Sequence, residues 1–415
     1  MTWAVPAWMQ YEEGVDQRTP DLSAIVQEIV NRPGWNRGSA LAMVIVKATG
    51  SGPGVRHAYT ADAETVGPGS KYAGAPMLHV QWIGPYQLRD LGILSRGTYA
   101  YAFGVNQLGE AAGYSETIAG RSVDRAVLFG DSSPTDLRTP WTIADKSYAY
   151  GINEARTIIG YINRQGSGTY VRAFRWTPAG GMGLLSTLGG PSAALDLNQA
   201  GATVGYSQNG RGVDRAVLWS ATSPALTDLG SLAGPAATNA SYAYGIANSG
   251  DIVGRSVTAK NGPYRAFWLR PNRMLQAADD LGTLPGGLAS SAYSVNDRRQ
   301  IVGASQDAQQ NWHAFFRSPD SRALLDLGTL GGPTSFAHAI NSSGLVVGKA
   351  DTLAGAVAFA WQPGWPRLVD LNTFRPAGST LTLVSAEGVS NAGHIVGRAV
   401  AHTGHIRAFL LSPVP

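Results

Sequence analysis

The chain has 415 residues, of which 52 are Gly and 23 are Pro, and only 14% are charged, a composition typical of a turn-rich all-β protein. The absence of Cys excludes disulfides, thiolate metal sites and Cys nucleophiles, and no apolar run approaches the roughly 18 residues that a membrane-spanning helix requires. The net charge of +4 is spread along the chain without a basic cluster, so we expect no nucleic-acid partner.

Residues 1–84 do not share the sequence period of the rest of the chain and form the first predicted domain. Asp21 follows Pro20 as a suitable N-cap, and the apolar spacing that begins at Leu22 predicts one short helix over residues 21–31. Strands are predicted at residues 41–46, 55–59 and 77–82.

This first domain resembles the second half of a β-sandwich module found in secreted bacterial multidomain proteins. The resemblance is carried by residues 3–8, 17–22, 27–35 and 75–80. The first half of that module is missing, so the domain is a partial β-sandwich. Either the natural chain begins earlier, with a signal peptide and further strands, or another copy supplies the missing strands and joins subunits into a filament.

A unit of 45–49 residues is repeated seven times between residue 85 and the C-terminus. Each copy carries an Asn-x-x-Gly-like motif, and the Asn position is taken here as the anchor of the repeat. The seven anchors are Asn106, Asn153, Asn198, Ala247, Asn296, Asn341 and Ser390. An Ala lies four residues before every anchor and a Gly seven residues after it, as in Ala149 and Gly160, Ala243 and Gly254, and Ala337 and Gly348. A period of this length with strand-like content indicates propeller blades and not helical repeats.

Each repeat supplies four predicted strands, named a to d in chain order. In the second repeat these are residues 148–152, 157–161, 172–176 and 184–188. Strict alternation along strand a would place Tyr148 and Tyr150 on one face, and the small Ala149 and Gly151 on the other. We therefore expect the bulky face of each sheet to pack onto the small face of its neighbour.

These features predict a seven-bladed β-propeller with four-stranded blades over residues 85–415. The first recognisable element, at residues 88–92, has the sequence of a strand d, whereas the last, at residues 407–410, has that of a strand c. The N-terminal strand is therefore expected to complete the seventh blade and close the ring. An open solenoid is the alternative, in which the two ends would not meet.

An Arg precedes the Ala of strand c in five repeats, for example Arg172 and Arg265. These Arg side chains could form a cationic ring. Alternatively, each could pair with the Asp of strand d, as Arg215 with Asp228, and the joint recurrence of Arg and Asp favours this structural ion pair.

The repeats resemble a family of bacterial extracellular repeat proteins named after a His-Ala-Phe signature (the HAF repeat), which stands here as His313-Ala314-Phe315. The segments at residues 327–332 and 340–348 belong to the same pattern, and the resemblance covers the repeat region. It implies secretion and a propeller-like fold, and it brings no catalytic activity with it.

Loop length varies most in the b–c and d–a connections, which lie at the same end of a blade, and function on a rigid scaffold often lies on such loops. The candidate ligand-binding residues near them are Tyr170, Tyr264, Trp312, His402 and His405. Such side chains suit a sugar or a peptide, and ordinary loop packing is the alternative. The spacing of His394, His402 and His405 matches no metal motif, so we expect neither a metal nor another cofactor.

The sequence carries no phosphate-binding loop, nucleophile elbow or pair of Glu at catalytic spacing. We therefore expect a secreted, non-enzymatic propeller that acts as an extracellular binding or structural surface protein, with a glycan or an extracellular protein as partner. A polysaccharide-acting enzyme is one alternative, which a deep axial pocket lined by two carboxylates would favour. The other is a filament subunit that self-assembles through the first domain.

Overall fold

The computed structural model describes residues 86–117, 123–138, 145–164, 170–222, 225–234, 236, 238–376 and 378–414. Regular structure in these ranges is almost entirely β-strand, with two short 3-10 turns at Ala277–Asp279 and Leu371–Phe374. None of the helices described there has the length and apolar character needed to cross a membrane. The predicted partial β-sandwich, its helix and its self-assembly lie outside the described residues.

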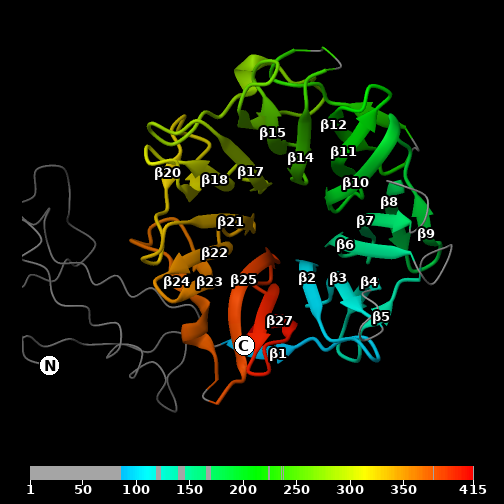
Figure 1. The fold of residues 1–415 in the computed structure, drawn as a ribbon, viewed down its shortest axis with the longest axis vertical. Helices are drawn as coiled ribbons and strands as arrows, with labels where there is room; N and C mark the ends of the chain where they lie inside the picture. Colours follow the sequence, from blue (N-terminus) through cyan, green and yellow to red (C-terminus); the bar gives the residue numbers. More distant parts are fainter. Residues whose placement is uncertain are drawn as a thin grey trace, which may run out of the picture. The chain divides into compact units, whose positions relative to one another are not determined.

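The described strands form seven antiparallel sheets around a central axis, so this part of the chain is a seven-bladed β-propeller (Figure 1). Strand a of each blade lies nearest the axis and the later strands follow outward. Blades 1 to 3 are β2 (Ala100–Val105), β3 (Ala111–Glu116), β4 (Asp124–Phe129) and β5 (Thr135–Asp136); β6 (Lys146–Ile152), β7 (Ile158–Arg164), β8 (Tyr170–Thr177) and β9 (Gly181–Leu184); and β10 (Gly189–Leu197), β11 (Thr203–Asn209), β12 (Asp214–Trp219) and β13 (Leu226–Asp228).

Blades 4 to 6 continue the same order along the chain. They are β14 (Ser241–Ile246), β15 (Ile252–Val257) and β16 (Tyr264–Leu269); β17 (Ser290–Val295), β18 (Ile301–Gln306), β19 (Trp312–Arg317) and β20 (Leu325–Asp326); and β21 (Ser335–Ile340), β22 (Val346–Thr352), β23 (Gly355–Trp361) and β24 (Val369–Asp370). Blade 7 contains β25 (Leu381–Val389), β26 (Ile395–Ala401), β27 (Ile406–Pro413) and the N-terminal β1 (Tyr86–Asp90).

The ring closes because the N-terminal strand β1 joins the sheet formed by the last three strands of the chain. Strand β1 pairs antiparallel with β27, so that Arg89 lies opposite Leu410, and the amide of Leu91 donates to the carbonyl oxygen of Ala408 at 2.9 Å. The predicted closure is confirmed, and an open solenoid is excluded. This pairing also covers the outer edge of β27, which would otherwise be exposed.

Four strands are present in six of the seven described sheets, and blade 4 has three. In blade 4, Asp280 forms an isolated antiparallel bridge to Phe267 at the place of the fourth strand. The predicted four-stranded blade is therefore wrong for blade 4. In blade 2 the fourth strand is Gly181–Leu184, so the strand predicted at residues 184–188 was placed too far along the chain.

Strand a of every blade contains a β-bulge, which the sequence interpretation did not foresee. In blade 1, Ala102 pairs with Gly113 and Gly104 pairs with Ala112, which leaves Phe103 as an extra residue. The same irregularity occurs three residues before the anchor in the other six blades. Paired residues share a face of a sheet, so Ala102 and Gly104 lie on opposite faces, and the predicted alternation is wrong.

Near the axis, neighbouring blades meet backbone to backbone. A Cβ on Gly104 would lie 2.9 Å from the carbonyl oxygen of Tyr150 in blade 2, and a Cβ on Gly388 would overlap the carbonyl oxygen of Phe103 in blade 1. Only a very small residue fits at these positions. Further from the axis, aromatic rings of neighbouring blades pack on each other, as for Tyr114 and Tyr148 at 4.9 Å, so bulky residues meet bulky residues there.

The hydrophobic core lies between the blades and is built by strand c. Its Phe side chain, which follows the recurrent Ala, is fully buried in five blades. These residues are Phe174, Phe267, Phe315, Phe359 and Phe409. Burial of each contributes roughly 1.5–3 kcal/mol. Buried Ser side chains connect the blades in addition, since the amide of Ala126 donates to Ser147 Oγ at 2.9 Å and that of Ala314 to Ser335 Oγ at 2.8 Å.

Substitution of Gly388 by Ala tests the close contact between blades 7 and 1. We expect Gly388→Ala to lower the free energy of unfolding by about 1–3 kcal/mol, because the added methyl group has no room beside the Phe103 carbonyl. Gly130→Ala is the matched control, since a Cβ there meets no atom within 4 Å. Chemical denaturation followed by fluorescence measures both, and equal stability of the two variants would contradict the packing described.

Candidate functional site: an axial pocket

The seven bulges build the wall of a pocket on the propeller axis. The pocket has a volume of about 550 Å³ and receives one bulge residue from each blade. These residues are Phe103, Tyr150, Leu195, Tyr244, Tyr293, His338 and Glu387. A bulge redirects a side chain out of the regular ladder. Because strand a is innermost, the extra residue lines the axis.

The pocket lies at the end of the axis that carries the a–b turns. The first residues after the anchors form a ring there, called the collar: Gln107, Glu154, Gln199, Asn248, Asp297, Ser342 and Asn391. Collar residues of successive blades are hydrogen-bonded. The amide of Gln199 donates to Asn248 Oδ1 at 2.9 Å, and the amide of Ser342 donates to Asn391 Oδ1 at 2.8 Å.

The anchor Asn residues stabilise the same end of the ring. Asn341 Oδ1 accepts from the amide of Leu345 at 2.9 Å within its own hairpin. Its Nδ2 donates to the carbonyl oxygen of Ser390 in the next blade at 3.0 Å, and Asn296 Nδ2 donates likewise to the carbonyl of Asn341 at 2.8 Å. Each such Asn therefore shapes its own turn and binds the next one, which holds the pocket mouth in place.

Aromatic rings form much of the pocket wall. The rings of Phe103 and Tyr150 lie 4.8 Å apart, and those of Tyr244 and Tyr293 lie 5.7 Å apart. Burial raises the pKa of the phenol groups of Tyr150, Tyr244 and Tyr293. At neutral pH these groups are therefore neutral and can both donate and accept hydrogen bonds.

A His–Glu pair from blades 6 and 7 occupies another part of the wall. His338 Nδ1 lies 3.0 Å from Glu387 Oε2, and Ser385 Oγ donates to Glu387 Oε1 at 2.7 Å. Burial alone would raise the pKa of Glu387, but the charge and hydrogen bond of His338 outweigh it and lower the pKa to about 2. Burial likewise opposes protonation of His338, and the charge of Glu387 overcomes it and raises the His338 pKa.

Asp196 of blade 3 is a carboxylate at the position where Gly104, Gly151 and Gly388 stand in their blades. Its Oδ2 accepts from the amide of Ile246 in blade 4 at 2.8 Å, and its Oδ1 accepts from the amide of Leu197 at 2.8 Å. Desolvation by burial raises its pKa to about 7, against the effect of these two hydrogen bonds. Asp196 thus joins two blades through a carboxylate that no described cation pairs with.

Three carboxylates line the pocket, which meets the requirement of the enzyme alternative for at least two: Asp196, Glu387 and the collar residue Asp297. All three are engaged by the protein itself. Both oxygens of Asp196 accept backbone amides, and both oxygens of Glu387 contact a side chain of blade 6 or 7. Asp297 accepts from the amide of Ser249 and from Asn248 Nδ2. These contacts give the three side chains a structural role.

The residues predicted as ligand-binding lie elsewhere, and none of them lines the pocket. Tyr170, Tyr264 and Trp312 begin β8, β16 and β19, and His402 and His405 lie exposed in the loop between β26 and β27. All are at the b–c end of their blades, opposite the a–b turns. The ring of Trp312 stacks on Phe336 of blade 6 at 6.3 Å, a packing contact between blades. Among the described residues no group of three metal-binding side chains occurs.

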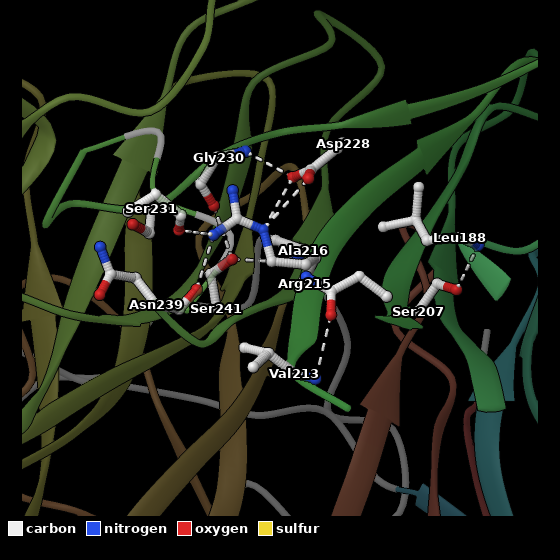
Figure 2. Close-up of polar contacts among 12 residues, drawn as sticks. Leu188, Ser207, Val213, Arg215, Ala216, Asp228, Gly230, Ser231, Asn239 and Ser241 are labelled. Atoms are coloured by element: carbon white, nitrogen blue, oxygen red, sulfur yellow. Dashed lines mark hydrogen bonds and ion pairs between the residues drawn. The ribbon is translucent and has the colours of Figure 1, made fainter. Parts of the chain in front are cut away.

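The Arg residues before strand c take part in structural contacts. Figure 2 shows Arg215, whose Nε lies 3.1 Å from Asp228 Oδ2 and whose Nη1 donates to the carbonyl oxygen of Asn239. Arg265 Nε lies 3.7 Å from Asp280 Oδ1, and Arg407 Nε lies 3.6 Å from Oδ2 of Asp90 in the closing strand β1. Arg172 donates to the carbonyl oxygen of Leu185, since its blade has no Asp there. The structural ion pair therefore describes Arg215, Arg265 and Arg407.

The bulge residues were missed because the sequence was read with strict alternation. A signal was nevertheless present. The position three before the anchor holds Phe, Tyr, Leu, Tyr, Tyr, His and Glu in turn, between an invariant Ala and a position that is mostly Gly. Chemical variety inside a constant frame is what a ligand-contacting position on a repeat scaffold shows.

Comparisons with known proteins add evidence on the fold alone. No protein-family model matches the chain, and no curated protein matches it. A structure from an analysis of two prolyl endopeptidases is 9% identical with a TM-score of 0.50, covering 77% of this chain and 51% of that one. A puromycin hydrolase is 16% identical with a TM-score of 0.48, and the match covers 77% of this chain and 55% of the hydrolase. A Burkholderia pseudomallei lectin is 11% identical with a TM-score of 0.43, and the match covers 77% of this chain and 99% of the lectin. The chain thus spans about half the length of both hydrolases. The similarity to the prolyl endopeptidase structure concerns the fold alone.

Asp196 should make stability depend on pH. Its pKa is about 7 in the folded protein and 3.8 in its ordinary state, so between these values the folded chain holds a proton that the unfolded chain has lost. The free energy of unfolding should therefore fall as pH rises from 4 towards about 7, and Asp196→Asn should remove this slope. Denaturant midpoints across this pH range measure it. Asp131→Asn, at an exposed carboxylate, is the control, and an unchanged slope in Asp196→Asn would contradict the assignment.

Proposed function

We propose that this protein is a non-enzymatic binding propeller whose ligand occupies the axial pocket. The observation that supports this most is the ring of seven bulges, which direct side chains of five different types to the axis from an otherwise constant frame. Packing of the blades alone would not require this variety. Because the repeats resemble those of the extracellular HAF-repeat proteins, we also propose that the protein acts outside the cell, as a binding or surface component.

The pocket chemistry favours a hydroxylated ring as ligand. Neutral Tyr side chains offer flat faces and hydroxyl groups together, and the collar above them adds amide and carboxylate groups. Binding sites typically combine apolar surface with a few directed polar groups in this way. A glycan meets both demands, because its rings have apolar faces and its edges carry hydroxyl groups.

Loss of a pocket ring should weaken binding, whereas loss of a ring at the b–c end should not. For a glycan identified on an array, we expect Tyr150→Ala to weaken binding at least about tenfold, equivalent to 1.4 kcal/mol. Trp312→Ala should keep the affinity and lose stability only, because Trp312 packs against Phe336. Isothermal titration measures affinity, and thermal melting confirms that each variant is folded.

The reverse result, with binding lost in Trp312→Ala and kept in Tyr150→Ala, would move the site to the b–c end. If no array glycan and no extracellular protein binds in a way that Tyr150→Ala changes, the axial binding function is wrong.

A polysaccharide-acting enzyme is the second candidate, and one observation favours it. The pKa of Asp196 is raised to about 7 and that of Glu387 is lowered to about 2, so one carboxyl can carry a proton while the other is charged. Glycosidases use such a division of roles.

Prolonged incubation with a polysaccharide panel, followed by measurement of new reducing ends, decides between the two functions. We expect no products, because the three pocket carboxylates are all held by protein groups. Product formation that Asp196→Asn lowers by about 10²-fold or more would instead establish the enzyme.

A further inference from the structure

A second ring of side chains occupies the position eight residues after each anchor, in strand b, one strand further out than the bulge residues of strand a. This position pairs across the sheet with the residue five before the anchor, as Arg255 does with Tyr242. From blade 1 to blade 7 this second ring contains Tyr114, Tyr161, Tyr206, Arg255, Ala304, Lys349 and Arg398. Tyrosine thus fills the first three blades, and basic residues stand in three of the last four.

The three basic residues differ in their partners. Arg398 Nε lies 4.0 Å from Glu387 Oε1, so a carboxylate of the same blade balances its charge. Lys349 Nζ lies over the ring of Phe336 at 5.9 Å. Arg255 has no ion pair with any carboxylate of the described residues, and it is surrounded by aromatic rings instead.

Three Tyr rings enclose the Arg255 guanidinium. Its Cζ lies 4.5 Å from the ring centroid of Tyr264, 5.0 Å from that of Tyr242 and 5.7 Å from that of Tyr244. The Nε is buried and has no hydrogen-bond partner in the structure, whereas the residue as a whole is only partly buried. Cation–π contacts hold the group in place and leave its charge without a counter-ion.

This cation is connected to the axial pocket through Tyr244. Arg255 does not itself line the pocket, but it contacts the Tyr244 ring, which does, as does Tyr293 of the next blade. The charge of Arg255 acts on both phenols, since it opposes the burial that raises the pKa of Tyr244 and Tyr293. A ligand seated against these two rings would meet the guanidinium only through a substituent that extends past the Tyr244 ring, whose centroid lies 5.7 Å from the Arg255 Cζ.

We propose that the axial site binds an acidic saccharide, whose carboxylate pairs with the Nη groups of Arg255 while its sugar rings lie against Tyr244 and Tyr293. This proposal rests on the binding function proposed above. A guanidinium and a carboxylate form a planar pair with two parallel hydrogen bonds. One uncompensated cation matches one carboxylate, whereas a phosphate monoester would bring a second negative charge that Arg255 alone does not balance.

Matched ligand pairs test the charge directly. Trisaccharides of galacturonate, glucuronate and mannuronate are titrated into the whole protein alongside their methyl esters, which keep the sugar and remove the charge. For at least one sugar the acid should bind about tenfold or more tightly than its ester. The difference should shrink as salt concentration rises, because the interaction is partly exposed.

Variants assign the effect to this side chain. Arg255→Gln should bind acid and ester equally, and Arg255→Lys should keep part of the preference, since it retains charge without the planar fork. Arg270→Gln is the matched control, because it removes an exposed Arg from the same blade and should preserve the preference. Thermal melting of each unliganded variant verifies the fold.

The possible failures are distinguishable. Equal binding of acid and ester by the wild type, or an acid preference that survives in Arg255→Gln, overturns the acidic-saccharide proposal. If binding is still sensitive to Tyr150→Ala in that case, the axial binding function stands. Absence of any binding to the uronates overturns the acidic-saccharide proposal as well, and the array experiment with Tyr150→Ala then decides the function independently.

Discussion

The close approach of neighbouring inner strands at the axis is the constraint on which the rest of this propeller depends. Seven strands converge there, and Gly104 and Gly388, each two residues before its anchor, lie against the backbone of the next blade and admit no larger side chain. The two polar residues found at this position accept hydrogen bonds from the next blade. Ser294 Oγ accepts from the amide of Ile340, and Asp196 Oδ2 accepts from that of Ile246. The bulge residue just before this position is the one whose side chain is free to differ.

The same geometry separates the frame of the protein from its variable part. The collar and the anchor Asn residues connect the a–b turns of successive blades by hydrogen bonds. The same contacts that join the blades therefore also shape the mouth of the pocket. The bulge residues differ from blade to blade without changing that frame. This end of the axis is opposite the b–c and d–a loops, where chain length varies. Variation in side-chain chemistry and variation in loop length therefore occur at different ends of the molecule.

The charged side chains of the interior fall into two groups: those that the protein itself supplies with an oppositely charged partner, and those that it does not. Arg215 is bound by Asp228 and by a backbone carbonyl, and Glu387 is bound by His338 and Ser385, so these groups hold blades together. Both oxygens of Asp196 accept hydrogen bonds, but no cation pairs with the carboxylate. Burial therefore raises its pKa. Arg255 alone among these four is held by rings and lacks an anion. An unsatisfied charge beside a pocket is where an external ligand gains most.

The sequence repeat by itself determined much of the architecture of this protein. Seven anchors at regular spacing indicated the number of blades. A strand-d sequence at residues 88–92, before any strand a, indicated how the ring closes, because an exposed sheet edge must be covered. The site could not be obtained in the same way. Alternation along a strand is a local rule, whereas the bulge at Phe103 and its equivalents arises from pairing with strand b and from crowding at the axis. Likewise, Tyr242, Arg255 and Tyr264 come together only when three strands are aligned. Local sequence therefore determined the blade and the ring, and tertiary packing decided which side chains face the axis.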